Sequence, residues 1–238
     1  MSERMRVSFE SVSTIDPQER TNMFRLRKKV FCDELGWDIP HCSGKEADVF
    51  DIYNSFYMNL VCKNSGGIAG SVRLIPLSDE NLICTIFKRC LEGTEDVSSS
   101  NLVWEGTRLC IDESICSSRD YHSTMLQLLL ALYQTCKVVG IERLMCNCSS
   151  SMLRFYRNFG LEIEKFGNMK ELRHGVVHCI AFDISPLNKQ ALQKHASREG
   201  LNWPEIEGRG IKPACLITGK RPSYQRNIEI PENSVATV

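Results

Sequence analysis

The stretch VWEGTRLCID, residues 103–112, places two opposite charges inside an apolar strand pattern. Glu105 and Arg108 stand three positions apart among core-type residues. Because the side chains of a strand alternate between its faces, residues three apart should point in opposite directions. One charge would then lie in the core, where an unpaired charge is costly. Two interpretations remain: a buried structural ion pair, or a β-bulge at Gly106 that brings both side chains to one functional site.

The composition is that of an ordinary globular protein with one large domain. The chain has 238 residues, of which 42% are apolar and 24% charged, and its formal net charge is zero. Zero net charge and the lack of a long basic run disfavour nucleic-acid binding. The longest apolar stretch, residues 125–133, is too short to span a bilayer, and the N-terminus lacks the apolar segment of a secretory signal. We expect a cytoplasmic protein that binds no nucleic acid and does not insert stably into a membrane.

Twelve cysteines are unusual for such a chain, but their spacing predicts no metal site. No C-x-x-C pair occurs, and the closest pair is Cys146 and Cys148. Zinc sites need paired ligands at hairpin or helix spacing. We therefore expect no metal and interpret the cysteines as reduced, mostly buried side chains.

Helix and strand signals alternate along most of the chain. A helix is expected to begin after Asp16, which can cap it, and to end at Gly36. Residues 37–54 read as an irregular acidic loop, and long loops of this kind are often functional. The other expected elements are strands at 56–62, 68–77, 103–112, 142–149, about 161–166 and 175–184, and helices at about 83–90, 120–139, 150–159 and 186–197. This order predicts a mixed β-sheet flanked by helices, of α/β or α+β class.

The C-terminal part of the chain lacks this periodicity. Residues 200–238 contain four prolines and read as an extended tail. We therefore predict a single domain over residues 1–199, followed by a C-terminal extension of residues 200–238.

Two groups of residues near the N-terminus are candidates for a binding site. Arg27 and Phe31 share one helix face at i, i+4 spacing, and Trp37 follows, so they form either a surface arginine beside core aromatics or a wall around a ligand. Glu46, Asp48 and Asp51 cluster in the acidic loop. These carboxylates could be solvated, could bind calcium although no EF-hand repeat is present, or could recognise a small cation such as an ammonium or sulfonium group.

Two further candidates lie in strands. Strand alternation allows Arg73 simply to face water. Glu105 and Arg108, if they are not a structural pair, could be a general base beside an arginine that binds a carboxylate.

The order and spacing of these residues are more specific than any one of them. The motifs are R-x-x-x-F-x-x-x-x-x-W (Arg27, Phe31, Trp37), E-x-D-x-x-D (Glu46, Asp48, Asp51), G-S-x-R-L-x-P (Gly70, Ser71, Arg73, Leu74, Pro76) and W-E-x-[ST]-R (Trp104, Glu105, Thr107, Arg108). A weaker fifth motif is SMLRFYRNFG, with Met152, Arg154, Arg157 and Gly160. Over about residues 20–185 the chain resembles the acyl-homoserine-lactone synthase (autoinducer synthase) family.

The resemblance implies a GNAT-like fold, in which a central mixed sheet is splayed near the active site, and an acyltransferase activity. Such enzymes move an acyl chain from acyl carrier protein or acyl-CoA to the amine of S-adenosylmethionine, a substrate rather than a cofactor. Lactonisation then releases methylthioadenosine and a quorum-sensing signal. By the same resemblance Glu105 is the base, and the S-adenosylmethionine side comprises Arg27, Phe31, Trp37, Asp48, Asp51, Arg73, Trp104 and Arg108.

The acyl pocket is harder to predict from the sequence, because its apolar residues have the same pattern as those of a hydrophobic core. Candidates are Met125, Leu128, Cys146, Cys148 and Met152. In the family pattern a threonine that often stands four residues before the methionine is associated with 3-oxo chains, and Cys148 stands there. This favours an unsubstituted, branched or aryl acyl group.

The donor and the competing functions remain open at this stage. Acyl carrier proteins are acidic, so a basic docking patch is expected, with Arg154, Arg157 and Lys165 as candidates. Another GNAT-type N-acyltransferase using acetyl-CoA would show a glycine-rich loop before its long helix, whereas residues 111–124 contain no glycine. A non-enzymatic binding module would need the charged residues to be purely structural.

Overall fold

The computed structural model describes residues 5–51, 55–77, 81–85, 87–91, 102–115, 121–172 and 175–207. The strands are β1 Met5–Ser11, β2 His41–Cys42, β3 Lys45–Glu46, β4 Phe56–Cys62, β5 Ile68–Pro76, β6 Val103–Ile111, β7 Arg143–Ser149, β8 Glu164–Leu172, β9 Gly175–Asp183 and β10 Ile206–Glu207. The α-helices are α1 Pro17–Arg27, α2 Leu82–Thr85, α3 Tyr121–Val139, α4 Ser150–Asn158 and α5 Pro186–Arg198. A π-helical segment, Lys28–Glu34, continues α1, and 3-10 turns lie at Lys88–Leu91 and Glu113–Ile115.

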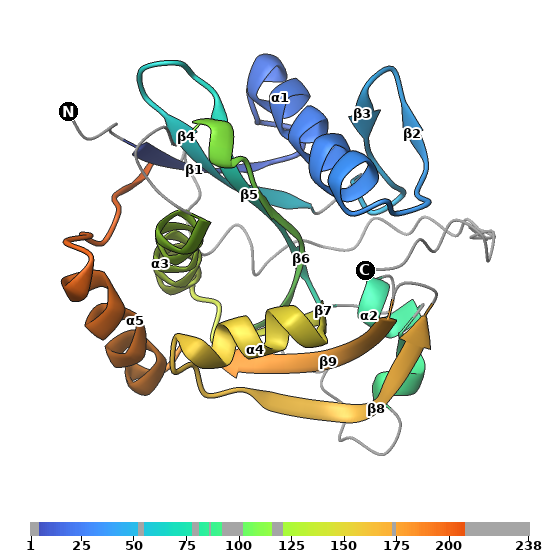
Figure 1. The fold of residues 1–238 in the computed structure, drawn as a ribbon, viewed down its shortest axis with the longest axis vertical. Helices are drawn as coiled ribbons and strands as arrows, with labels where there is room; N and C mark the ends of the chain where they lie inside the picture. The colour runs from blue at the N-terminus through green and yellow to red at the C-terminus, as the bar shows by residue number, and fades with distance from the viewer. Residues whose placement is uncertain are drawn as a thin grey trace.

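A twisted eight-stranded sheet organises the molecule (Figure 1). Its strand order is β10-β1-β4-β5-β6-β7-β9-β8. β6 pairs with β7 and β1 with β10 in parallel, and the other neighbours are antiparallel. The predicted mixed sheet flanked by helices is confirmed.

Helices cover both faces of this sheet (Figure 1). On one face, here called the α1 face, α1 and α2 cover side chains that include Tyr57, Arg73 and Glu105. On the opposite α3 face, α3 and α4 bury the large apolar core, and α5 packs against α3. The middle of α3, residues 124–133, is mostly apolar and almost wholly buried, as expected of a helix that is covered on most sides.

The start of α1 follows its sequence signals. The Asp16 carboxylate accepts hydrogen bonds from the backbone N–H groups of Gln18 and Glu19, and Pro17 occupies the first turn. The chain leaves the helical region at Gly36, whose φ of +66° suits glycine. Phe31 and Trp37, which follow α1, therefore belong to a hydrophobic cluster that includes Cys110 of β6.

Three elements differ from the sequence expectation. β1 was not expected, although Met5, Val7 and Phe9 alternate with Arg6, Ser8 and Glu10 as in a strand; the structure pairs it with β4. The loop expected to be irregular contains the short hairpin β2–β3. The first residues of the expected C-terminal extension join the domain: Leu201 is buried and β10 pairs with β1. Residues 208–238 lie outside the described residues.

The described cysteines are free thiols, as expected, and most are buried: Cys62, Cys110, Cys136, Cys146, Cys148 and Cys179. Cys42 is exposed. Among the described helices, none is long and apolar enough to cross a membrane.

The two central strands, β6 and β7, separate part of the way along their length. They pair only where Val103, Trp104 and Glu105 lie opposite Arg143, Leu144 and Met145. Beyond Glu105, β6 pairs only with β5, and beyond Met145, β7 pairs only with β9. The sheet therefore opens between residues 106–111 of β6 and residues 146–149 of β7.

Candidate functional site

Three arginines and three carboxylates form a buried network on the α1 face. Arg27, at the end of α1, is 1% exposed. Its Nε donates to Glu46 Oε2 at 2.5 Å, and its Nη1 and Nη2 donate to the two carboxylate oxygens of Asp51 at 2.6 and 2.8 Å. This bidentate pair joins α1 to the acidic loop, and Glu46 joins it to the β2–β3 hairpin.

Arg73 and Arg108 complete the network from the sheet. The Nη1 of Arg73 donates to Asp48 at 2.5 Å and to Asp51 at 2.9 Å, and its Nε donates to the hydroxyl of Thr107 at 2.9 Å. The Nη2 of Arg108 donates to Asp48 at 2.8 Å and to Glu46 at 3.2 Å. Three guanidinium groups thus meet three carboxylates, and each carboxylate accepts from at least one arginine.

The charges of this network are mutually stabilised. Burial alone would lower the pKa of Arg73, but Asp48 and Asp51 raise it above its usual value. Burial would raise the pKa of Asp51, but Arg73 and Arg27 hold it well below its usual value. Burial likewise opposes ionisation of Asp48, and Arg73 and Arg108 lower its pKa. Arg73 is therefore not a surface residue, and both Asp side chains stay ionised near neutral pH.

The β6 strand contains a bulge, but it does not lie at Gly106 as the sequence predicted. Gly106 pairs regularly with Leu74, and the register shifts between the pairs Arg73–Thr107 and Ser71–Cys110. Arg108 and Leu109 therefore hold the extra residue, and Arg108 has φ +55°, the left-handed region. The bulge turns Arg108 toward Glu46 and Asp48, on the same face as Glu105.

Glu105 does not form an ion pair with Arg108. Its side chain is fully buried, and its carboxylate accepts hydrogen bonds from the backbone N–H groups of Leu82 at 3.0 Å and Ile83 at 3.1 Å, at the start of α2. Burial raises the pKa of Glu105 to about 7, although a hydrogen bond with Asn81 and the charge of Arg73 act against it. A carboxylate with this pKa can take up a proton near neutral pH.

Phe31 and Trp37 form an aromatic wall beside Arg108. Their rings stack with centroids 4.7 Å apart, and the guanidinium of Arg108 lies 5.6 Å from the centre of the Phe31 ring. The wall combines a flat apolar surface with a guanidinium group that is already paired with carboxylates, a combination that suits a planar ligand.

A cavity of about 650 Å³ lies where β6 and β7 separate. On the α1 face it is lined by Phe31, Trp37, Leu82, Thr107, Arg108 and Asn147. On the α3 face it is lined by Met125, Cys146, Cys148, Met152 and Tyr156. One cavity thus connects a polar and aromatic wall with an apolar wall through the opening in the sheet.

The structure divides the candidate residues into three groups. The lining of the cavity includes Phe31, Trp37, Arg108, Met125, Cys146, Cys148 and Met152. The buried network behind it contains Arg27, Arg73, Asp48 and Asp51, and Glu105 adjoins Arg73 and α2. Two candidates lie in the core of the α3 face instead: Trp104, which packs on Phe56 with ring centroids 5.3 Å apart, and Leu128, which packs near Gly70.

Three residues of the site were not among the predicted site residues. Tyr57 donates its hydroxyl hydrogen bond to Asp51 at 2.9 Å, and burial together with that carboxylate raises the pKa of Tyr57. Thr107 was only a motif position, although it holds Arg73. Asn147 is a polar residue between two cysteines in an apolar strand, and this pattern could have indicated a site at β7.

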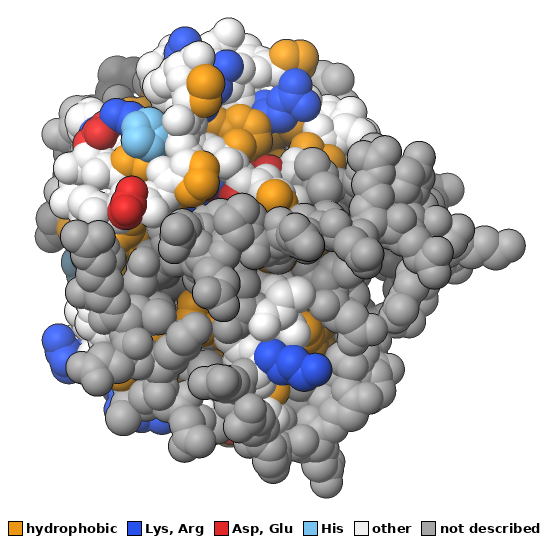
Figure 2. Space-filling view, turned by 90° about the vertical axis from the view of Figure 1, so that its right-hand side faces the viewer, with side chains coloured by type: hydrophobic (Ala, Val, Ile, Leu, Met, Phe, Trp, Pro, Cys, Tyr) orange, Lys and Arg blue, Asp and Glu red, His pale blue; other side chains and the backbone are white. Residues whose placement is uncertain are grey.

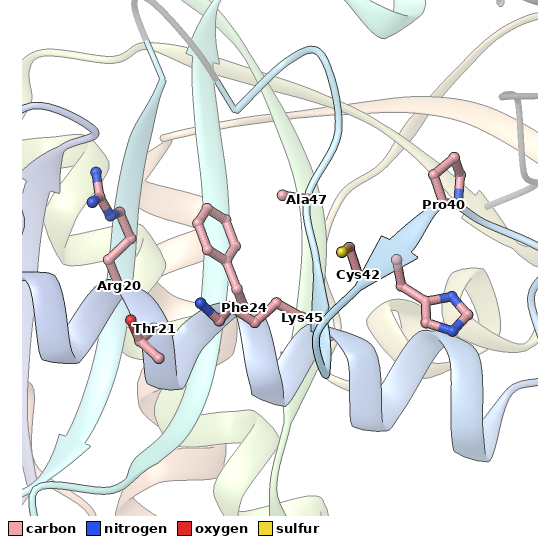
Figure 3. A pocket seen from close by; sticks show the side chains of 8 residues that line it. Arg20, Thr21, Phe24, Pro40, Cys42, Lys45 and Ala47 are labelled. Carbon is pink, nitrogen blue, oxygen red and sulfur yellow. The ribbon is translucent and has the colours of Figure 1, made fainter.

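A second cavity, of about 430 Å³, lies between α1 and the β2–β3 hairpin. Arg20, Thr21 and Phe24 project from α1, and Cys42 and Lys45 from the hairpin (Figure 3). The side of the molecule that carries the hairpin presents hydrophobic and basic side chains next to one another (Figure 2). The two cavities share no lining residue, so this one is separate from the site at the sheet opening.

The chain is similar in sequence to known proteins. The family model described as autoinducer synthase matches residues 12–192. An acyl-homoserine-lactone synthase of Aeromonas hydrophila is 31% identical over 160 residues, which cover 66% of this chain and 76% of that protein. An acyl-homoserine-lactone synthase of Agrobacterium fabrum is 29% identical over 148 residues, 61% of this chain and 69% of that protein.

Solved structures share the fold. BjaI, a CoA-dependent acyl-homoserine lactone synthase solved with SAM and isopentyl-CoA, matches with a TM-score of 0.76 at 20% identity over 90% of this chain and 99% of its own. The synthase LasI matches with a TM-score of 0.72 at 21% identity, over 81% of this chain and 96% of its own.

Proposed function

This chain belongs to the autoinducer synthase family, and we propose that it makes an N-acyl-L-homoserine lactone from S-adenosylmethionine and an acyl thioester. The observation that carries this proposal is the single cavity that passes through the opening between β6 and β7. Its α1-face wall suits the nucleotide and amino-acid parts of S-adenosylmethionine, and its apolar α3-face wall suits an acyl chain. The thioester would lie between them, in the opening itself.

Glu105 is the proposed general base. An amine attacks a thioester only when it is neutral, so a proton must leave it, directly or through a water molecule. A carboxylate with a pKa of about 7 matches that task near neutral pH. The amine then attacks the thioester carbon, and the donor leaves as a thiol.

The oxyanion that forms in this step needs hydrogen-bond donors. Beyond Met145, the edge of β7 that faces β6 has no partner among the described strands. Backbone N–H groups on that edge can donate to the developing oxyanion, which is an effective way to stabilise such a transition state. In the second step a carboxylate oxygen of the acylated S-adenosylmethionine attacks its own γ-carbon, the C–S bond breaks, and methylthioadenosine leaves.

Apart from Arg108, which lines the cavity, the residues of the buried network support this site without contacting the substrate, in our proposal. Arg27, Asp51 and Arg73 fix the acidic loop against the sheet, which holds Phe31, Trp37 and Arg108 in place. Such preorganisation matters because small displacements of binding groups lower catalytic rates strongly. The reaction would need no cofactor and would take place in the cytoplasm, where both substrates are made.

The acyl donor is either CoA or acyl carrier protein. A solved relative is CoA-dependent, which supports the first. The exposed side chains of Arg154, Arg157 and Lys165 give a basic surface on α4 and β8 that fits the acidic helices of a carrier protein. Reversing the charge of Arg154 and Arg157 should weaken a carrier-protein donor and leave a CoA donor unaffected.

The experiment is mass spectrometry of the products formed from S-adenosylmethionine and a panel of acyl thioesters. The panel contains short, branched, 3-oxo and aryl groups on both carriers. A lactone with an equal amount of methylthioadenosine supports the proposal and identifies the donor. An acylated product without methylthioadenosine would point to another N-acyltransferase, and a protein that fails to bind S-adenosylmethionine would overturn the proposal.

A further inference from the structure

Asn147 is a buried amide with no hydrogen-bond partner in the described part of the chain. The residue is 8% exposed, and neither its Nδ2 nor its Oδ1 has a partner there. Buried polar groups are nearly always hydrogen-bonded, because leaving one unpaired is costly. Unlike a core residue, however, Asn147 lines the cavity at the sheet opening. A bound ligand is therefore the natural partner of this amide.

The register of the sheet places Asn147 on the α1 face. Met145 lies opposite Glu105, and Asn147 follows two positions later on β7, just as Thr107 follows Glu105 on β6. Strand side chains stand perpendicular to the sheet, so Asn147 and Thr107 flank the opening on the side of Glu105. Cys146 and Cys148 point to the opposite, apolar side. Asn147 thus faces the space proposed for the amino-acid substrate and not the space proposed for the acyl chain.

The chemistry of that space requires neutral hydrogen-bond donors. The amino group to be acylated must lie near Glu105, and its carboxylate is attached to the same carbon. The guanidinium groups of Arg27, Arg73 and Arg108 are balanced by three carboxylates, so they leave little net positive charge for a fourth. The Thr107 oxygen already accepts from Arg73, which leaves its O–H free to donate. The Nδ2 of Asn147 is the donor across the opening.

We propose that Asn147 binds the carboxylate of the methionyl part of S-adenosylmethionine and orients it for lactonisation. This inference rests on the proposed function. Holding one carboxylate oxygen leaves the other directed at the γ-carbon. That oxygen forms the C–O bond as the C–S bond breaks, and the electron pair passes to sulfur, which leaves as the neutral thioether. Asn147 is a binding and positioning residue in this step and transfers no proton.

Synthetic N-acyl-S-adenosylmethionine tests the inference, because it bypasses acyl transfer. Single-turnover release of methylthioadenosine is measured for the wild type, N147L and N147D at pH 8. Leucine keeps the volume and removes the donor, so we expect release to slow by roughly 10- to 100-fold, the loss typical of a hydrogen bond to a charged group. Aspartate adds a negative charge beside the carboxylate, so N147D should be slower still. The melting temperature of N147L should not fall, since an unpaired buried amide has been removed.

Gln127 provides the matched control. Its Oε1 on α3 is also buried without a partner among the described residues, but Gln127 does not line the cavity at the sheet opening. Q127L should therefore release methylthioadenosine at the wild-type rate. If N147L keeps the wild-type rate, or if N147D is faster than N147L, the inference is overturned. A wild-type protein that cannot convert the acylated substrate would instead overturn the proposed function itself.

Discussion

Asp51 and Arg27 form a bidentate ion pair in which both carboxylate oxygens accept from the two terminal guanidinium nitrogens, at 2.6 and 2.8 Å. Both side chains are almost inaccessible to solvent. The pair links the acidic loop to α1, and Arg73 shares the same carboxylate. The loop is therefore held by charge pairing rather than by apolar packing alone.

Asp51→Asn should consequently unfold the site. The substitution leaves Arg27 and Arg73 buried with one carboxylate too few, and breaking a buried pair from one side costs about 3–5 kcal/mol. Denaturant unfolding gives the change in free energy. The control is Asp33→Asn, which removes an exposed pair with Lys28 and should cost less than about 1 kcal/mol. Equal effects of the two substitutions would contradict the role assigned to the network.

Glu105→Gln should abolish turnover. Its effect on the free energy of unfolding should depend on pH. In the wild type the base must be ionised, so kcat/KM should fall tenfold per pH unit below about pH 7. The folded pKa lies above the value of 4.5 expected for an exposed glutamate. The native state therefore binds the proton more tightly, and the wild type loses stability as pH rises from about 4.5 to 7.

Glutamine does not titrate, so the comparison isolates this effect. Between pH 4.5 and pH 8 the wild type should lose about 3 kcal/mol of unfolding free energy relative to Glu105→Gln. Denaturant titrations at several pH values measure it. A pH-independent difference would mean that Glu105 has an ordinary pKa.

Trp37→Leu should weaken binding of S-adenosylmethionine more than it affects folding. Trp37 stacks on Phe31 and lines the cavity while remaining half-buried. Losing an aromatic contact with a planar ligand is worth about 1 kcal/mol, so KM should rise about fivefold or more. Trp203→Leu is the control, since Trp203 packs on Tyr133 away from this cavity. If KM rose for Trp203→Leu and not for Trp37→Leu, Trp37 would not be part of the binding site.

Arg108→Gly should be more stable than Arg108→Ala. Both lose the contacts with Glu46 and Asp48, but only glycine is free of the steric cost of φ +55°. The difference in free energy of unfolding should be about 1 kcal/mol. A more stable alanine variant would show that the bulge relaxes when the arginine is removed.

Cys148→Phe should shorten the acyl chains that the enzyme accepts. Cys148 lines the apolar part of the cavity, and a phenyl ring there would fill part of its volume. Product mass spectrometry over a series of chain lengths measures the shift. Leu128→Ala is the control because Leu128 lies in the core outside this lining; it should lower stability by about 2–5 kcal/mol without changing chain preference.

The sequence predicted the central architecture because its signals are local. The cap at Asp16 and the stop at Gly36 depend on neighbouring residues, and α1 with its π-helical extension lies between them. β1 has a local signal as well, the alternation of apolar and polar residues, whereas β2 and β3 have only two residues each and no such pattern. Distant partners also hold β1 in place. Ser8, for example, donates from β1 to Glu19 in α1.

The site was predicted in composition but not in geometry. Glu105 and Arg108 do reach one face, yet the bulge lies two residues beyond Gly106. At the bulge Arg108 contacts Glu46 and Asp48, which lie about sixty residues away in sequence, and no strand pattern contains such contacts. Met125 and Leu128 are equally apolar, and only the packing of α3 places one in the cavity lining and the other in the core.

The balance of three guanidinium groups against three carboxylates also affects how the results of a mutational survey of this protein should be interpreted. Alanine at any of these six positions leaves the rest with an uncompensated buried charge, so each variant would lose activity whether or not the side chain meets the substrate. A scan scored by activity alone would report six essential residues and would rank them beside Glu105. Paired substitutions that remove one charge of each sign would separate the residues that hold the site together from those that act within it.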